Sequence, residues 1–146
     1  MRYETGTLLL ELERGHLLRL AVWAIGSMLG GALLMHWARR ARQPAFWRHA
    51  GIQTAAWGAV DLAIVALAWR GLATRDLAGA IALDRVLWLN IGLDVGYAMV
   101  GLTLLVFGLR APRRPGLMGA GTAIVAQGLA LAVLDAILSA AIVRPA

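Results

Sequence analysis

Long apolar stretches, separated by short charged segments, dominate the chain. A window scan finds four of them, at residues 17–38, 50–69, 86–109 and 117–143. Each has about the ~20 residues that an α-helix, rising ~1.5 Å per residue, needs to cross ~30 Å of hydrocarbon. The pattern predicts an all-α fold, a polytopic four-helix transmembrane bundle, in one domain spanning residues 17–146.

Residues 1–16 precede the first stretch and differ from it in character. They include TGTLLLELERGHLL, whose leucines and mixed charges suit an N-terminal interfacial segment. The first apolar stretch is followed by MHWARRAR and not by a small-residue cleavage site. We therefore expect a retained helix rather than a cleaved signal peptide.

Composition supports the membrane interpretation and excludes several chemistries. The chain has 146 residues, of which 60% are hydrophobic and 15% charged, and its mean hydropathy is +0.72. It has no cysteine, which excludes disulfides, thiolate metal sites and thiol nucleophiles. No cofactor or metal motif is present, and no cofactor is expected. The net charge of +6 comes without a basic patch interleaved with aromatics, so the expected partner is the lipid bilayer and not nucleic acid.

Arginine placement bears on the topology. Two short connections, at residues 39–49 and 110–116, together carry seven arginines and no acid, whereas the other side carries seven arginines mixed with acids over longer segments. The raw tally is a tie, but the density in the short loops predicts that they are cytoplasmic, in a multi-pass membrane protein.

Polar residues recur at a fixed spacing in the two halves. Gln53, Asp61 and Arg70 are each followed, 74 residues later, by the same residue type: Gln127, Asp135 and Arg144. This spacing predicts two tandem helical hairpins in parallel repeat, related by a pseudo-two-fold axis along the membrane normal. Chance matching of apolar helices is the alternative.

Three carboxyl groups lie inside the apolar stretches: Asp61, Asp94 and Asp135. A charged residue at the centre of a membrane helix costs ~2.5–3.5 kcal/mol on insertion scales. These side chains must therefore face the interior of the bundle, be protonated, or both. At ~100° per residue, other polar and aromatic residues share their helix faces. The candidate binding or proton-relay residues are Asp61, Asp94, Asp135, Asn90, Gln53, Gln127, Trp57 and Tyr97.

Two interpretations of this cluster remain open. Intramembrane ionisable residues often mark ion or substrate pathways. Amides and protonated carboxyls can also serve only as packing links between helices, worth ~0.6 kcal/mol each on average.

The segments LNIGLDVGY (89–97), QTAAWGAVD (53–61) and QGLALAVLD (127–135) carry a resemblance. With them the chain resembles a family of small, uncharacterised bacterial four-helix integral membrane proteins. The resemblance implies a bacterial inner-membrane location and a single four-helix domain. It transfers no catalytic or binding residue.

Three functions compete at this point. The first is a binding or transport module for protons, a small cation or a small polar solute at the Asp/Asn/Gln cluster. The second is an accessory or assembly subunit of a larger membrane complex, with a homodimer or another membrane protein as partner. The third is an enzyme acting on an apolar, lipid-like substrate with an aspartate as general acid, which is the least favoured because no nucleophile or metal cluster accompanies it.

Overall fold

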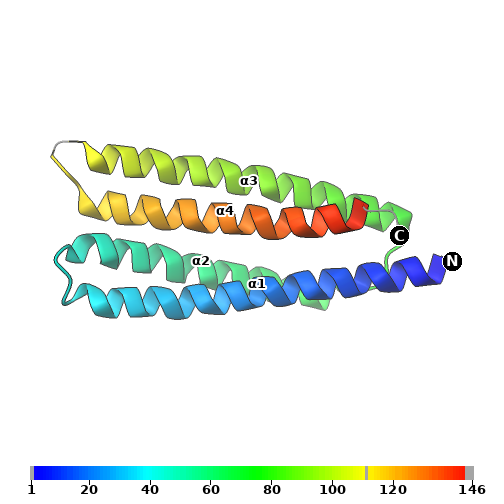
Figure 1. Ribbon diagram of the computed structural model, residues 1–146. Coiled ribbons are helices and arrows are strands. Elements are labelled where there is room, and N and C mark those ends of the chain that lie inside the picture. The colour runs from blue at the N-terminus through cyan, green and yellow to red at the C-terminus, as the bar shows by residue number, and fades with distance from the viewer. Residues whose placement is uncertain (1, 111, 144–146) are drawn as a thin grey trace.

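The computed structural model describes residues 2–110 and 112–143, and within them the chain forms four long helices and no β-strand. They pair into two antiparallel hairpins that lie side by side (Figure 1). Both hairpin loops lie at one end of the bundle, and the two chain ends and the connection between hairpins lie at the other. The helices are α1 (Arg2–Ala38), α2 (Pro44–Arg70), α3 (Leu77–Leu109) and α4 (Pro115–Val143).

The predicted all-helical, four-helix architecture is confirmed. Each helix is long and apolar enough to cross a membrane. α1 packs along α2 and α3 along α4, while α4 also contacts α2 and, over a shorter length, α1.

All four helices begin earlier than the apolar stretches suggested, and the local cause is visible at α2 and α3. α2 starts at Pro44, in the first helical turn, where a missing backbone N–H costs nothing. α3 starts after Asp76, whose carboxylate accepts a hydrogen bond from the backbone N–H of Gly79 at 2.8 Å. A hydropathy scan detects only the apolar part of each helix, so it places these starts too late.

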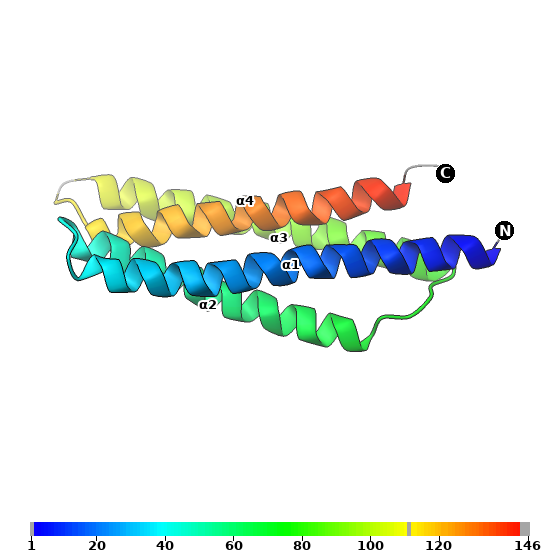
Figure 2. The same cartoon turned by 60° about the horizontal axis from the view of Figure 1, so that its bottom comes forward.

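Residues 2–16 continue directly into the first apolar stretch as part of α1. At ~1.5 Å per residue, α1 is about 55 Å long, well beyond the ~30 Å of a hydrocarbon core. The N-terminal end of α1 extends past the ends of α2 and α4 (Figure 2). Placement of this end in a membrane interface stays a prediction.

Glycine brings the two helices of each hairpin into backbone contact. In the first hairpin, a Cβ on Gly31 would lie 2.5 Å from the carbonyl oxygen of Gly51. In the second, a Cβ on Gly101 would lie 2.8 Å from the carbonyl oxygen of Gly121. Real Cβ atoms essentially never come this close, so the helix spacing requires glycine at these positions.

A second pair of contacts repeats the relation. A Cβ on Gly58 would lie 2.6 Å from the carbonyl oxygen of Ala24, and one on Gly128 would lie 2.5 Å from that of Asp94. In both pairs of contacts, each residue of the first hairpin has its counterpart in the second hairpin 70 positions later. The structural offset is therefore 70, one helical turn away from the offset of 74 between the repeated polar residues.

This offset changes which positions correspond. The residue 70 positions after Asp61 is Leu131, which is therefore its equivalent in the second hairpin. Asp94 and Asp135 lie in the second hairpin, and the residues 70 positions before them are Ala24 and Val65. Each aspartate thus matches an apolar residue in the other hairpin. The carboxyl groups are features of one hairpin or the other and not a repeated pair.

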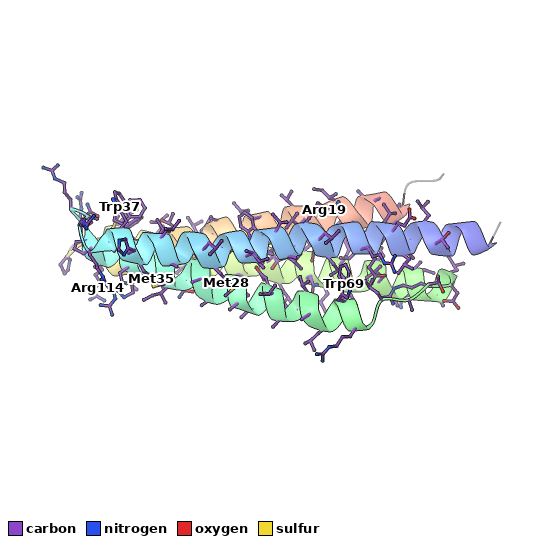
Figure 3. All side chains as sticks on the ribbon, turned by 90° about the horizontal axis from the view of Figure 1, so that it is seen from below. Arg19, Met28, Met35, Trp37, Trp69 and Arg114 are labelled. Atoms are coloured by element: carbon purple, nitrogen blue, oxygen red, sulfur yellow. The ribbon has the colours of Figure 1, made fainter. Side chains whose placement is uncertain are left out.

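Towards its C-terminal end, α2 turns away from α1 (Figures 2 and 3). The glycine contacts between helices begin near the hairpin loops and extend to the level of Ala24 and Asp94. Beyond that level, towards the chain ends, no described glycine would bring a Cβ within 3.0 Å of another helix. The bundle is consequently packed most closely in the half nearest the hairpin loops.

Candidate functional site

Three carboxyl groups gather where the close glycine packing ends. Asp61 is 2% exposed and Asp135 8% exposed, while Asp94 is half-buried. Each lies within electrostatic range of the other two. Three helices, α2, α3 and α4, supply these groups. We call Asp61, Asp94, Asp135 and the neighbouring His16 the carboxyl cluster.

Asp61 is the most deeply buried member. Gly58, one turn earlier on α2, lets this helix approach the backbone of α1 and so fixes the depth of the carboxyl group. Within the described part of the chain, Asp61 Oδ2 is fully buried and has no hydrogen-bond partner. A buried oxygen without a partner costs about 1–3 kcal/mol unless water, a proton or a ligand satisfies it.

Asp135 has a partner from α1. His16 Nε2 lies 3.3 Å from Asp135 Oδ1, and His16 is itself only 6% exposed. The second ring nitrogen, His16 Nδ1, is buried and has no hydrogen-bond partner among the described residues. The pair therefore joins two proton-exchanging groups and leaves one ring nitrogen unused by the protein.

Gln127 links the two hairpins near the middle of the bundle. Its Oε1 accepts a hydrogen bond from Trp23 Nε1 at 2.7 Å, and its Nε2 donates to Ser27 Oγ at 2.9 Å. Both ends of the amide therefore bond to side chains of α1.

Trp57 and Tyr97 form a second link between the hairpins. Trp57 Nε1 donates to Tyr97 Oη at 2.9 Å, and the two rings pack edge to face with their centroids 4.5 Å apart. At the offset of 70, Trp57 corresponds to Gln127 and Tyr97 corresponds to Ser27. This bond therefore joins the positions that are equivalent to Gln127 and Ser27. The two inter-hairpin links are thus related by the same offset as the glycine contacts.

The remaining two candidates lie apart from these links. Gln53 is half-buried, and Asn90 is exposed on the bundle surface. Neither forms a hydrogen bond through its side chain with another described residue. Asn90 shares a helical face with Asp94 and Tyr97, but its side chain is exposed whereas those of Asp94 and Tyr97 are half-buried.

Polar contacts continue from the carboxyl cluster to the end of the bundle that holds the chain ends. Ser139 Oγ donates to Asp84 Oδ1 at 2.6 Å and joins α4 to α3. Further out, Arg75 donates two hydrogen bonds to Glu13, at 3.0 and 2.7 Å. The hydrogen bond to Glu13 is the main reason that the pKa of Arg75 is raised, outweighing the opposing effect of burial.

Sequence reasoning missed part of this arrangement. It did not include His16, Trp23, Ser27, Asp84 or Ser139 among the site residues. The available signal was weak, because His16 and Asp84 lie outside the four apolar stretches and serine is common in helix interfaces. Among the described residues, no group of three or more His, Asp or Glu side chains could hold a metal ion.

Comparison with known proteins places the chain in a family. The model of DUF6992, described as a family of unknown function, matches residues 19–136. The chain belongs to DUF6992. The match covers the three aspartates and both inter-hairpin links of this DUF6992 protein. No curated protein and no solved structure matches it. The expected membership of a family of unknown function is therefore confirmed. Membership of DUF6992 assigns no activity to the carboxyl cluster.

Proposed function

We propose that this DUF6992 protein is an integral membrane protein that binds or transports protons at the carboxyl cluster. A small cation or a small polar solute would bind to the same groups. The observation that carries the proposal is the buried, unpartnered oxygen of Asp61 within electrostatic range of Asp94 and Asp135. A protein that used these residues only for packing would gain more from groups whose hydrogen bonds are all satisfied.

Membrane insertion is the first part of the proposal. All four helices are of spanning length, and their surface exposes large apolar side chains such as Val22, Leu33, Leu67 and Leu93. Only lipid or another protein can cover such a surface stably. We place the arginine-rich loops at residues 39–43 and 110–114 in the cytoplasm of a bacterial cell, because basic residues concentrate in short cytoplasmic loops.

The chemistry of the cluster favours protons. Carboxyl groups that are close together inside a bundle do not all ionise independently, so a proton bound by one affects the others. His16 adds an imidazole that accepts or donates a proton at either nitrogen. We infer that protons exchange among Asp61, Asp94, Asp135 and His16, with the contact between His16 and Asp135 as the shortest step that the structure shows.

Access to the cluster differs between its two sides. Towards the chain ends, α2 and α1 separate, and polar contacts at Asp84 and Glu13 follow. Towards the hairpin loops, Gly31, Gly51 and their equivalents bring the backbones together. We infer that protons or solutes reach the cluster from the side of the chain ends, and that passage to the other side requires the glycine contacts to open.

The test is flux into liposomes that contain the purified protein and a pH-sensitive dye. Asp61→Asn, Asp94→Asn and Asp135→Asn are compared with the wild type, and Asp76→Asn is the matched control. Asp76 is exposed and caps α3, a role that asparagine fills equally well. Loss of proton flux in the three cluster variants but not in the control supports the transport proposal, and unchanged flux in all three refutes it.

We also propose that the two hairpins arose by duplication and form a parallel repeat about an axis along the bundle. The support is the common offset of 70 among the glycine contacts and the two inter-hairpin links. On this view, Asp61, Asp94 and Asp135 were acquired separately after duplication, because their equivalents are apolar.

A second candidate function is a subunit of a larger membrane assembly. The favouring observation is on α3, where the space beside Gly92 and Gly96 is open. Small residues on a lipid-facing helix let a partner helix approach closely. Purification in a mild detergent tests this candidate: co-purification of a defined partner that Gly96→Leu removes supports it, and an isolated monomer argues against it.

A further inference from the structure

A groove runs along the bundle surface between α1 and α4. Its volume is about 760 Å³, and its lining is almost entirely apolar. Gly26 lies in its wall, and a Cβ added there would meet no atom within 4 Å. The groove exists because α1 and α4 contact each other over only part of their length, while each packs closely on its own hairpin partner.

One cation stands at the end of this groove. Of the residues that line it, Arg19 alone is charged. Arg19 is exposed and forms no ion pair with any carboxylate of the described residues. In Figure 3, Arg19 lies on the side of α1 that faces α4. An apolar channel with one unpaired guanidinium at its end is complementary to an amphiphile with an anionic head and an apolar tail.

The position of Arg19 along the helix fits a lipid headgroup. From Arg19 to Ala38, the last residue of α1, the helix rises about 28 Å, close to the ~30 Å thickness of a hydrocarbon core. From Arg19 to Gly26 it rises about 10 Å, within the ~15 Å of one leaflet. An acyl chain that begins at Arg19 would therefore lie along the groove within a single leaflet.

We propose that the groove between α1 and α4 is a binding site for an anionic phospholipid, with its phosphate on Arg19 and one acyl chain against Gly26 and Val133. This inference rests on the proposed membrane insertion but not on proton binding at the carboxyl cluster. Guanidinium groups bind phosphate through two parallel hydrogen bonds, and basic positions between membrane helices recognise anionic headgroups. The apolar lining provides affinity for the chain, and Arg19 provides the preference for negative charge.

Native mass spectrometry of the full chain tests the site, after equilibration with equal amounts of phosphatidylglycerol and phosphatidylcholine. The wild type should retain one phosphatidylglycerol preferentially. Arg19→Gln should reduce that preference by about fivefold, the effect of losing one basic residue at a membrane surface. Gly26→Leu should reduce retention of both lipids, because its side chain fills the groove.

Two controls separate the site from general effects. Gly96 is the position equivalent to Gly26 in the other hairpin and also faces open space, so Gly96→Leu should leave lipid retention unchanged. Arg70→Gln removes an exposed arginine outside the groove and should leave the preference intact. Equal preference in the wild type and Arg19→Gln overturns the lipid site. Failure of the wild-type chain to enter lipid nanodiscs overturns membrane insertion itself.

Discussion

Replacing a single glycine in a hairpin interface should destabilise the bundle, and the structure sets the size of the effect. In Gly31→Ala, the new methyl group would lie 2.5 Å from the carbonyl oxygen of Gly51 and 2.6 Å from the backbone nitrogen of Ala55. Backbone atoms of a packed helix cannot move aside as a flexible side chain can. Forcing a methyl group into such a contact costs about 1–3 kcal/mol.

A matched substitution removes the effect of helix propensity. Gly26 lies on the same helix, five residues earlier, and a Cβ there meets open space. Alanine gains about 1 kcal/mol of helix propensity over glycine at either position. The difference between Gly31→Ala and Gly26→Ala is therefore the steric cost alone, about 1–3 kcal/mol.

The assay is unfolding of the purified protein in mixed micelles with increasing denaturing detergent, followed by circular dichroism. Gly101→Ala and Gly96→Ala repeat the comparison in the second hairpin, where the equivalent positions have the same crowded and open surroundings. Both crowded variants should unfold at lower denaturant than their open controls. If Gly31→Ala and Gly26→Ala unfold at the same point, the close helix contact is not present in the folded protein.

Three further substitutions test the polar contacts. Gln127→Leu should cost about 1–3 kcal/mol of unfolding free energy, because it removes the acceptor of Trp23 Nε1 and the donor to the buried Ser27 Oγ. A loss no larger than that of an exposed Gln→Leu substitution would contradict the link. Tyr97→Phe removes one hydrogen bond and should cost about 0.6 kcal/mol, measured in the same assay against the Tyr97→Leu loss of ring packing. Glu13→Gln should cost about 1 kcal/mol through loss of the pair with Arg75. Because the pKa of Arg75 is raised, the guanidinium stays charged at neutral and moderately alkaline pH. The arginine's contribution is lost only as pH rises past its unfolded pKa towards the raised one, so this loss should be equal at neutral and moderately alkaline pH.

The architecture was predictable because long apolar helices leave a strong and local signal. Runs of apolar residues of spanning length identify each helix whatever its neighbours are. Helix starts were less predictable, since the polar first turns at Pro44 and Asp76 depend on capping and not on hydropathy. The same limit explains why the continuous helix through residues 2–38 was divided at residue 16.

The site was predictable only in part. Burial of Asp61 and Asp135 follows from the cost of exposing a carboxyl group to lipid, and both are buried. Contacts between helices depend on rotation and register, which helical periodicity within one helix does not determine. Asn90 shares a face with Asp94 yet is exposed.

Register also explains the misleading repeat. Identical residues 74 positions apart suggested that Asp61 and Asp135 are equivalent. The glycine contacts of the first hairpin instead recur 70 positions later in the second. A shift of four residues keeps the same helix face, so the pattern of faces alone does not distinguish the two offsets. The discriminating signal in the sequence was glycine, since Gly31, Gly51 and Gly58 recur as Gly101, Gly121 and Gly128.

The central claim is that the buried carboxyl groups bind protons as one interacting cluster. Infrared spectroscopy of the protein in lipid, titrated with pH, measures it directly through the carbonyl band of protonated carboxyl groups. We expect the wild type to show this band. Asp61→Asn should diminish the band and change the titration midpoint of the remaining carboxyl groups, whereas Asp76→Asn should leave both unchanged. A titration that is identical in the wild type, Asp61→Asn, Asp94→Asn and Asp135→Asn would contradict the account.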